Sequence, residues 1–300
     1  MLMEIFEKLK DNRDERGKRH KLIDVIIMSI YGILSGNSDC ENIADWLELR
    51  SAYFIDLLKL ENGTPSVDTL LRVFRTLEPK QFMHLFTEWI KQIVSTKGGH
   101  IAIDGKAIKS AADKINHGNI PYVVSGFLTE IGISIGQVKI NEKSNEITVI
   151  PELLELLDLE EVTVTIDAIG TQKAIVNKII TKKGHYLLNV KENQKVLYWD
   201  IDEYFKFALS DREEKETIKS YEHGCIESRK YYVIEDVSFL TSKSEWKNLS
   251  SIGLVINQRK INGQESVQWK YYISDLKRTP EEFACLTRNL GRLKITCIGY

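Results

Sequence analysis

The sequence predicts an all-α amino-terminal domain followed by an α/β domain, in which helices flank a mixed sheet that carries a β-rich insertion. Between residues 21 and 94, apolar residues recur at spacings of three and four, as in amphipathic helices. After Gly98-Gly99 the pattern changes to short alternating or apolar runs separated by helical segments. Alternation then returns from residue 224 to 274. These three observations set the fold class.

The helical domain, residues 1–97, contains two clusters of positive charge. Thr64-Pro65-Ser66 precedes VDTLLRVFRTL, so Ser66 is expected to cap a helix on which Arg72 and Arg75 share a face. The segment RDERGKRHK supplies the second cluster, made of Arg13, Arg16, Lys18 and Arg19. Such clusters can bind DNA phosphates in a chain of net charge -2, although a solvated surface explains them as well.

The second domain, residues 98–300, begins with seven predicted elements. HIAID, YVVSGFL and ISIGQVKI form strands, the last two joined by a hairpin from Thr129 to Gly132. PELLELLDL is a helix with Pro151 near its first turn, and VTVTID is the next strand. TQKAIVNKIITKK is a helix closed by Gly184 as a left-handed cap, and HYLLNV is a strand. The order β-β-β-α-β-α-β favours a mixed sheet with helices on its faces, the ribonuclease H-like topology.

The rest of the chain is expected to add a helix, a β-rich insertion and a final helix. Residues 195–209 have a helical pattern. The insertion, at about residues 222–276, contains Asn262-Gly263 as a two-residue hairpin turn. Pro280 then introduces the helix EEFACLTRNL.

Two aspartates, Asp104 and Asp167, end strands that are expected to lie side by side. Carboxylate oxygens suit Mg²⁺ or Mn²⁺, and two such ions could support phosphodiester cleavage if a third carboxylate lay nearby. Aspartates at strand ends also cap helices or close turns, so this pattern alone leaves both roles open. Polar residues suited to phosphate contacts follow the two aspartates and the next strand, HYLLNV. They are Lys106 and Lys109 after Asp104, Gln172 after Asp167, and Lys191, Asn193 and Gln194 after HYLLNV.

Composition argues against two other classes of protein. The four cysteines are scattered and lack metal-ligand spacing, which argues against a zinc site. The longest apolar stretch, VIIMSIYGIL, is too short to span a bilayer, and Met1 does not open a signal sequence. We therefore expect a cytoplasmic protein that does not bind membranes.

Long segments of the chain resemble a known family. IDGKAIKS, GQVKINEKSNEITVIPELLELLDL, TVTIDAIGTQ and LLNVKENQ resemble the transposases of bacterial insertion sequences of the ISAs type, also called H-repeat-associated proteins. LIDVIIMSIYGILSGNSDCENIADW and GTPSVDTLLRVFRTL resemble the helical domain that precedes the catalytic region in that family. The resemblance covers almost the whole chain.

This resemblance implies a DDE transposase of ribonuclease H-like fold that uses Mg²⁺ to cut and rejoin DNA at the ends of its element. Asp104 and Asp167 match the family's first and second catalytic aspartates. The implied partners are double-stranded DNA, both terminal repeats and target, and a second copy of the chain on that DNA. An unrelated metal phosphatase or nuclease is disfavoured by the length of the matching motifs.

One block departs from the family pattern at a single position. The family shows HGRIExR, whereas this chain reads HGCIESR from residue 223 to 229, so Cys225 replaces the usual first arginine. Glu227 in this block is a candidate for the third catalytic acid. The alternative is a strand residue that forms a salt bridge with Arg229.

The sequence departs further after Asn289. The family continues with a helix reading roughly RNHWKIENNLHWVLD, whose glutamate resembles the third catalytic acid, but only Arg288 and Asn289 match here. With one choice of codons for the family text, deletion of a single base reproduces every residue from Asn289 to Tyr300, followed by a stop codon. We therefore expect a frameshifted, catalytically impaired copy, or alternatively a non-catalytic DNA-binding remnant that competes at terminal repeats.

Overall fold

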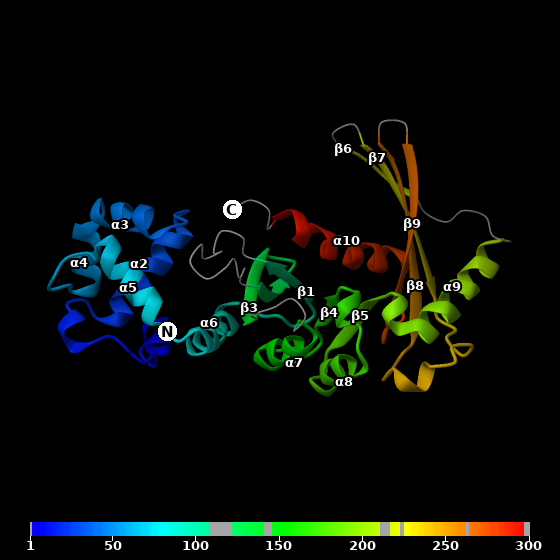
Figure 1. Ribbon diagram of the computed structural model, residues 1–300, viewed down its shortest axis with the longest axis horizontal. Helices are drawn as coiled ribbons and strands as arrows, with labels where there is room; N and C mark the ends of the chain where they lie inside the picture. The colour runs from blue at the N-terminus through cyan, green and yellow to red at the C-terminus, as the bar shows by residue number, and fades with distance from the viewer. Residues whose placement is uncertain are drawn as a thin grey trace, which may run out of the picture. The chain divides into compact units, whose positions relative to one another are not determined.

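The computed structural model describes residues 2–107, 122–140, 146–210, 217–222, 225–261 and 264–296 (Figure 1). The chain divides into two compact units, Met1–Val94 and Ser95–Tyr300. The sequence placed its domain boundary between residues 97 and 98.

The first unit is helical among its described residues. Its helices are α1 (Leu2–Phe6), α2 (Leu22–Leu34), α3 (Cys40–Glu48), α4 (Ser51–Leu58), α5 (Val67–Thr76) and α6 (Pro79–Ile93), with a 3-10 turn, η1, at Glu15–Gly17. Each longer helix turns an apolar stripe inward, so that Val25, Met28, Leu47, Phe54 and Leu70 are fully buried in one core. The predicted all-α character is confirmed.

Helix starts in this unit follow the local sequence. Ser66 is the N-cap residue of α5, as predicted, but its hydroxyl lies 3.2 Å from the Thr69 hydroxyl, and no cap hydrogen bond to the backbone forms. Glu78 caps α6 more completely, because its carboxylate accepts from the backbone N–H of Lys80 at 3.2 Å and of Gln81 at 2.6 Å.

The second unit is built on one mixed sheet. Its described strands are β1 (His100–Ala107), β2 (Tyr122–Leu128), β3 (Ile133–Ile140), β4 (Thr163–Ile166), β5 (His185–Val190), β6 (Thr217–Glu222), β7 (Cys225–Ile234), β8 (Ser251–Ile261) and β9 (Gln264–Ser274). The order across the sheet is β3-β2-β1-β4-β5-β9-β8-β7-β6, in which β1, β4 and β5 are parallel and the other neighbours are antiparallel. The first five strands have the ribonuclease H-like order that the sequence predicted.

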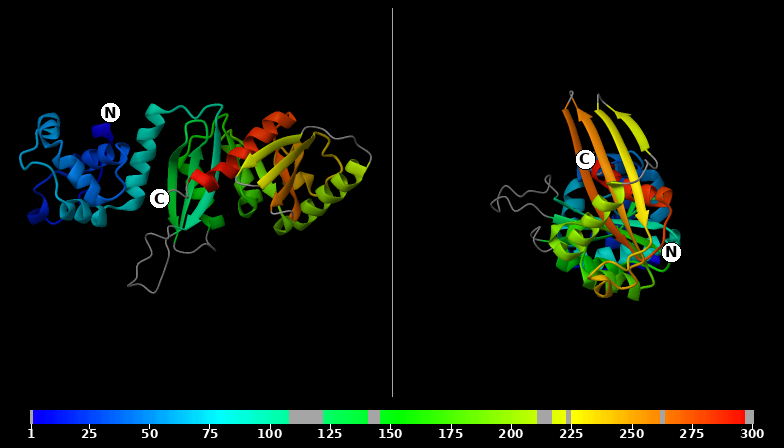
Figure 2. Two further views of the ribbon diagram at one scale, coloured as in Figure 1. Left: turned by 90° about the horizontal axis from the view of Figure 1, so that it is seen from above. Right: turned by 90° about the vertical axis from the view of Figure 1, so that its right-hand side faces the viewer.

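Helices cover both faces of this sheet. The connections include α7 (Glu146–Leu156), η4 (Ala168–Gly170), α8 (Lys173–Thr181), η5 (Glu192–Gln194), α9 (Lys195–Ser210), η6 (Lys243–Glu245) and α10 (Pro280–Thr296). Figures 1 and 2 show α10 on one side of the sheet and α7 and α8 on the other. Phe205 of α9 stacks on Tyr271, while Phe283 of α10 packs on Tyr231 and Tyr272. Because successive residues of a strand face opposite ways, Tyr272 points to the face opposite that of Tyr271. We call the face that carries Tyr231 and Tyr272 the α10 face.

Helix α10 begins with a reciprocal cap. The Thr279 hydroxyl accepts from the backbone N–H of Glu282 at 3.3 Å, and the Glu282 carboxylate accepts from the backbone N–H of Thr279 at 3.1 Å. Just before this cap, Arg278 donates to the hydroxyl of Thr163 at 2.7 Å. The cap and this hydrogen bond fix the start of the helix against the sheet.

Three local expectations differ from the structure. Strand β1 continues past Asp104 to Ala107, and Pro151 lies inside α7, which begins five residues earlier at Glu146. The left-handed residue after α8 is Lys183, with φ 59, whereas Gly184 lies where a Cβ would be 3.0 Å from the Leu159 carbonyl oxygen. The predicted β-rich insertion is present, and the pairing of β9 with β5 shows that it extends the main sheet. The predicted turn at residues 262–263 lies outside the described residues.

A buried histidine lies at the amino end of β1. The His100 ring contacts the hydroxyl of Thr165 at 2.8 Å and that of Thr129 at 3.1 Å. Burial, reinforced by the positive charge of Arg278, lowers the pKa of His100 to about 4 from 6.5. The fold therefore holds this imidazole in its neutral form.

We expect the free energy of unfolding to fall with acidification between pH 6.5 and pH 4. The unfolded chain binds a proton at His100 in this range and the folded chain does not, so the stability present above pH 6.5 is lost as the pH falls, by about 3 kcal/mol for this shift. Urea unfolding at several pH values measures it. His100→Gln should flatten this dependence and His84→Gln, in the first unit, should not; equal slopes in both variants would contradict the assignment.

None of the helices within the described ranges has both the length and the apolar character needed to cross a membrane.

Candidate functional site

The two aspartates follow directly on paired positions of neighbouring parallel strands. Ile103 of β1 is paired with Ile166, the last residue of β4, so Asp104 and Asp167 occupy the positions that directly follow this pair. Neighbouring strands lie about 4.8 Å apart, and alternation places both side chains on one face. Ile166 is also paired with Leu188 of β5, and Leu188 with Ile273 of β9. The next residue of β5, Asn189, is paired with Tyr272. The two aspartates therefore lie on the same face as Tyr272, which is the α10 face. Both aspartates are partly buried.

The backbone at Asp167 is extended, with φ -66 and ψ 166, and it ends the strand by capping η4. Its Oδ1 accepts from the backbone N–H of Ala168 at 2.6 Å, and the Nζ of Lys191 lies 3.7 Å from the same oxygen. The capping role left open by the sequence is therefore present at Asp167. This capping hydrogen bond holds the Asp167 carboxylate at the end of the sheet where the parallel strands terminate.

Asn193 and Gln194, which the sequence predicted to contact phosphates, form hydrogen bonds that support the loop after Asp167. The side-chain amide of Asn193 donates to the Ala168 carbonyl, and that of Gln194 donates to the Thr171 carbonyl, both at 2.9 Å. The Thr171 hydroxyl in turn donates to the Asn189 carbonyl at 2.5 Å. These bonds tie the segments that follow β4 and β5 together and fix the position of Asp167.

The remaining polar neighbours lie in different surroundings. Lys106 and Lys191 are exposed at the same edge of the sheet, where they are suited to meet phosphates. Gln172 is partly buried, and its side-chain oxygen lies 3.4 Å from the amide nitrogen of Gln194. Lys109 lies outside the described residues.

The structure does not bring Glu227 to the aspartate pair. It lies on β7, four strands from β4 in the sheet order, which is about 19 Å across the sheet. Burial raises its pKa, but hydrogen bonds and charge from Arg229 and Arg259 outweigh burial, so the net shift is downward. The alternative expectation for Glu227, a salt bridge with Arg229, is observed with an N–O distance of 2.9 Å.

The basic residues of the first unit divide into exposed and enclosed groups. Arg72 and Arg75 are exposed on α5, on the side away from its buried Leu70 and Val73, and Arg16 and Arg19 are also exposed. The Lys18 ammonium pairs with Glu15 at 2.5 Å.

Arg13 corrects the prediction of a basic surface. Its side chain is only 2% exposed, and it donates to Asp11 at 2.7 Å and to the His20 carbonyl at 2.9 Å. Its guanidinium is used inside the unit and cannot meet DNA without breaking these contacts.

The sequence analysis missed the side chains beside the aspartates on the α10 face. Asn189, from β5, donates to the Tyr271 carbonyl at 3.2 Å, and Tyr272 lies opposite it on β9. Burial raises the pKa of Tyr272, and the charges of Asp167 and then Tyr231 raise it further. The alternation in QWKYYIS indicates that Tyr272 has a buried face, but only the pairing of β5 with β9 places it next to Asp167.

The described residues supply an incomplete metal site. No group of three or more His, Cys, Asp or Glu side chains in the described ranges is placed to hold a metal ion. Asp104 and Asp167 provide two hard oxygen donor groups at one sheet edge, a donor set that fits Mg²⁺ or Mn²⁺ but does not saturate it.

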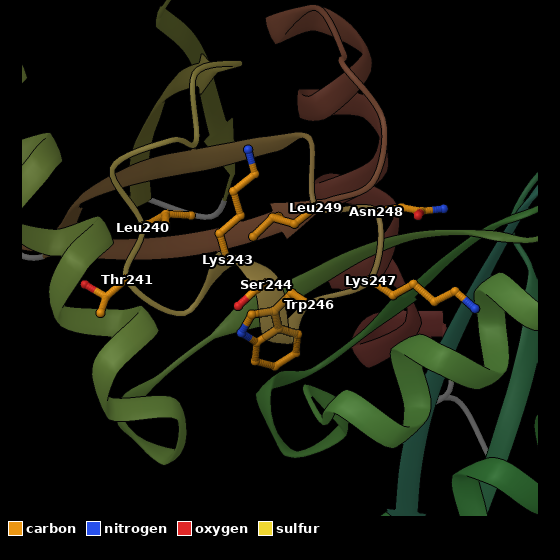
Figure 3. Close-up of a pocket in the computed structure, with 8 residues that line it drawn as sticks. All are labelled: Leu240, Thr241, Lys243, Ser244, Trp246, Lys247, Asn248 and Leu249. Carbon is orange, nitrogen blue, oxygen red and sulfur yellow. The ribbon is translucent and has the colours of Figure 1, made fainter.

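A surface pocket of about 520 Å³ lies elsewhere in this unit (Figure 3). It is lined by one loop segment between Leu240 and Leu249, with Trp246 and Lys243 among the lining residues. None of the residues predicted from the sequence lines it. The candidate site is therefore the open edge at Asp104 and Asp167.

Comparison with known proteins assigns each of the two units to a protein family. Residues 3–90 match the family model described as DDE_Tnp_1-associated, and residues 95–289 match the model described as Transposase DDE domain. The chain is 35% identical over 291 residues to "Putative transposase YncI" of Escherichia coli O157:H7, covering 94% of this chain and 74% of that protein. It is 34% identical over 296 residues to "H repeat-associated putative transposase YhhI" of Escherichia coli (strain K12), covering 96% and 78%.

Two further matches complete the comparison. An uncharacterized protein in the dhlA 3' region of Xanthobacter autotrophicus is 33% identical over 282 residues, covering 92% of this chain and 94% of that protein. Among solved structures, a piggyBac transposase synaptic complex with hairpin DNA aligns with 98% of this chain and 63% of that chain, at 12% identity and a TM-score of 0.45. On the family models and the curated relatives, this chain belongs to the DDE transposase family and carries its associated amino-terminal domain.

Proposed function

We propose that this chain is built to cleave phosphodiester bonds at the ends of an insertion sequence and to join them to target DNA. The observation that carries the proposal is the placement of Asp104 and Asp167 at equivalent positions on neighbouring parallel strands, in a member of the DDE transposase family. Cleavage and strand transfer are both in-line displacements at phosphorus, so one pair of carboxylates can serve both steps.

Asp104 and Asp167 would hold Mg²⁺ or Mn²⁺. Bound there, two divalent ions would stabilise the attacking and leaving oxygens of the displacement. Asn193 and Gln194 keep the loop after Asp167 in place, as their hydrogen bonds to Ala168 and Thr171 indicate. Two carboxylates leave two divalent ions with a surplus of about two positive charges, so the site calls for a third acid.

The proposed partner is double-stranded DNA, both terminal repeats and target, bound by a homodimer in the bacterial cytoplasm. Lys106 and Lys191, exposed at the edge where the aspartates lie, are proposed to contact phosphates near the cleaved bond. Arg16, Arg19, Arg72 and Arg75 are exposed in the first unit, which is proposed to bind the terminal repeat.

We further propose that this copy is catalytically impaired. Helix α10 packs on β1, which carries Asp104, and on β4, which is followed by Asp167, yet the sequence of α10 contains no acid after Glu282. The match to the Transposase DDE domain covers residues 95–289, and the residues after Asn289 lack the glutamate-containing helix sequence that the family resemblance implies. The second candidate function follows from the same observation: a chain that binds terminal repeats without cutting them would compete with intact copies.

The test compares this chain with a version in which the family text HWKIENNLHWVLD follows Asn289. Both should shift a duplex of the element's own terminal repeat at low salt, and only the restored version should nick that duplex in Mg²⁺. The expected gain exceeds about a hundredfold, because even residues behind metal ligands change activity by 10 to 100-fold. Equal cleavage by both chains would refute impairment, and failure of both to shift the duplex would refute the proposed function. Downstream DNA in which no other reading frame encodes IENNLHW would exclude the frameshift.

A further inference from the structure

The β ribbon at the end of the sheet carries a cluster of charged side chains on the α10 face. The ribbon comprises residues 225–230, 256–261 and 264–269, which extend beyond the rest of the sheet (Figure 1). Glu227 is paired with Arg259, and Arg229 with Asn257. Alternate residues of β7 share a face, so Tyr231 lies on the same face as Glu227 and Arg229. Tyr231 packs on Phe283 of α10. The cluster and the aspartate pair therefore lie on one face of one sheet.

Glu227 holds the two arginines together. Its Oε1 accepts from the Nε of Arg229 at 3.1 Å, from the Nη2 of Arg229 at 2.9 Å and from the Nε of Arg259 at 3.1 Å. The side chain of Asn257 adds a second acceptor for the Nε of Arg229, at 3.0 Å. Two guanidinium groups that would otherwise repel each other are thus fixed side by side.

The cluster keeps a surplus of positive charge at the surface. One carboxylate faces two guanidinium groups, and the Glu227 side chain is 16% exposed, whereas those of Arg229 and Arg259 are 31% and 50% exposed. The contact of Arg259 with Glu227 uses Nε. A planar guanidinium can present its remaining N–H groups to the two oxygens of a phosphate while it keeps such a contact.

The distance between the aspartates and the arginine cluster would let one DNA duplex reach both. Tyr272, Gly253 and Val233 lie in register across β9, β8 and β7, at the level of Asp167. Arg229 lies four residues before Val233, which is about 13 Å along the strand, and about 19 Å separates β7 from β4 across the sheet. The resulting span of about 23 Å corresponds to about seven base pairs at 3.4 Å each.

We propose that Arg229 and Arg259, positioned by Glu227, bind the phosphate backbone of the duplex about seven base pairs from the bond that the aspartate pair addresses. This rests on the proposed function, because it takes DNA at the aspartates as given. Glu227 is then a positioning residue that organises a phosphate contact, and the block HGCIESR acts in DNA binding.

The experiment measures binding of the full chain to a fluorescent terminal-repeat duplex that extends ten or more base pairs on both sides of the cleavage site, over a range of salt concentrations. Arg259→Ala and Arg229→Ala should each weaken binding about threefold to tenfold at moderate salt and reduce the slope of log affinity against log salt by about one. Arg259→Lys should keep the slope and lose part of the affinity. Lys260→Ala and Lys230→Ala remove the same charge from the opposite face of β8 and β7 and should leave the slope unchanged.

A second measurement separates the positioning role from metal binding. In the version with the restored family helix, Glu227→Gln should leave the Mg²⁺ concentration for half-maximal cleavage unchanged, whereas loss of a metal ligand would raise it tenfold or more. Arginine variants that bind like the lysine controls, or a shifted Mg²⁺ midpoint, would overturn this inference and leave the proposed function standing. If the parent chain does not bind the duplex at low salt, the proposed function itself fails.

Discussion

Asp104→Asn and Asp167→Asn should each abolish Mg²⁺-dependent nicking of the terminal repeat by the version of the chain that carries the restored family helix. An amide keeps the shape of the carboxyl group but removes the negative charge that a divalent ion requires. The expected loss exceeds about a hundredfold, which is more than residues behind metal ligands contribute. Single-turnover cleavage of an end-labelled duplex measures the rate, and calorimetric titration with Mn²⁺ measures binding independently of activity.

The matched control is Asp158→Asn, which removes an exposed carboxylate from the segment that precedes β4, at the opposite end of that strand from Asp167. It should leave both cleavage and Mn²⁺ binding unchanged. DNA binding at low salt should survive in all three variants. A variant of Asp104 or Asp167 that retains Mn²⁺ affinity would contradict the assignment of that residue to the metal site.

Phe283→Ala should lower the free energy of unfolding of the second unit by about 3 to 5 kcal/mol, the usual cost of removing a buried phenylalanine ring. The residue is 2% exposed, and its ring lies 5.3 Å from that of Tyr272 and 6.1 Å from that of Tyr231, both edge to face. The truncation leaves a cavity between α10 and the sheet. Urea unfolding followed by tryptophan fluorescence measures the change.

The control for this variant is Cys285→Ala on the same helix, where the side chain is exposed. It should change stability by less than about 0.5 kcal/mol. A loss of similar size in both variants would indicate that α10 is sensitive to any substitution, and a loss below about 1 kcal/mol at Phe283 would mean that the helix is not anchored by this ring. Because α10 packs beside β1 and β4, a loosened helix should also weaken metal binding at the aspartates.

Short-range patterns in the sequence were sufficient for the type and order of most elements. The alternation in YVVSGFL and ISIGQVKI and the three and four spacing in the first unit depend only on neighbouring residues, so they could be read without the fold. The same patterns placed Asp104 and Asp167 where strands lead toward one edge. Element boundaries followed less directly from local patterns: α7 begins at Glu146, five residues before Pro151, and this helix is stabilised by packing on β2 and β3.

The candidate site depended on contacts between distant segments. Glu227 and the aspartates are all acids on or directly after strands, and only the strand order shows that Glu227 on β7 is four strands from β4 and five from β1. Arg13 belongs to a basic run, and only its contacts with Asp11 and the His20 carbonyl show that it is enclosed. Gly253 gives no local signal, yet a Cβ there would lie 2.5 Å from the Phe283 ring.

The sequence by itself determined that a helical unit precedes an α/β unit, that two aspartates lie on or directly after strands of the sheet, and which family the sequence resembles. The tertiary structure decided which strands are neighbours, which register brings Asp104 beside Asp167, and which charged side chains are enclosed. The physical reason is that periodicity and capping are properties of adjacent residues, whereas pairing, burial and charge compensation depend on residues far apart in the chain.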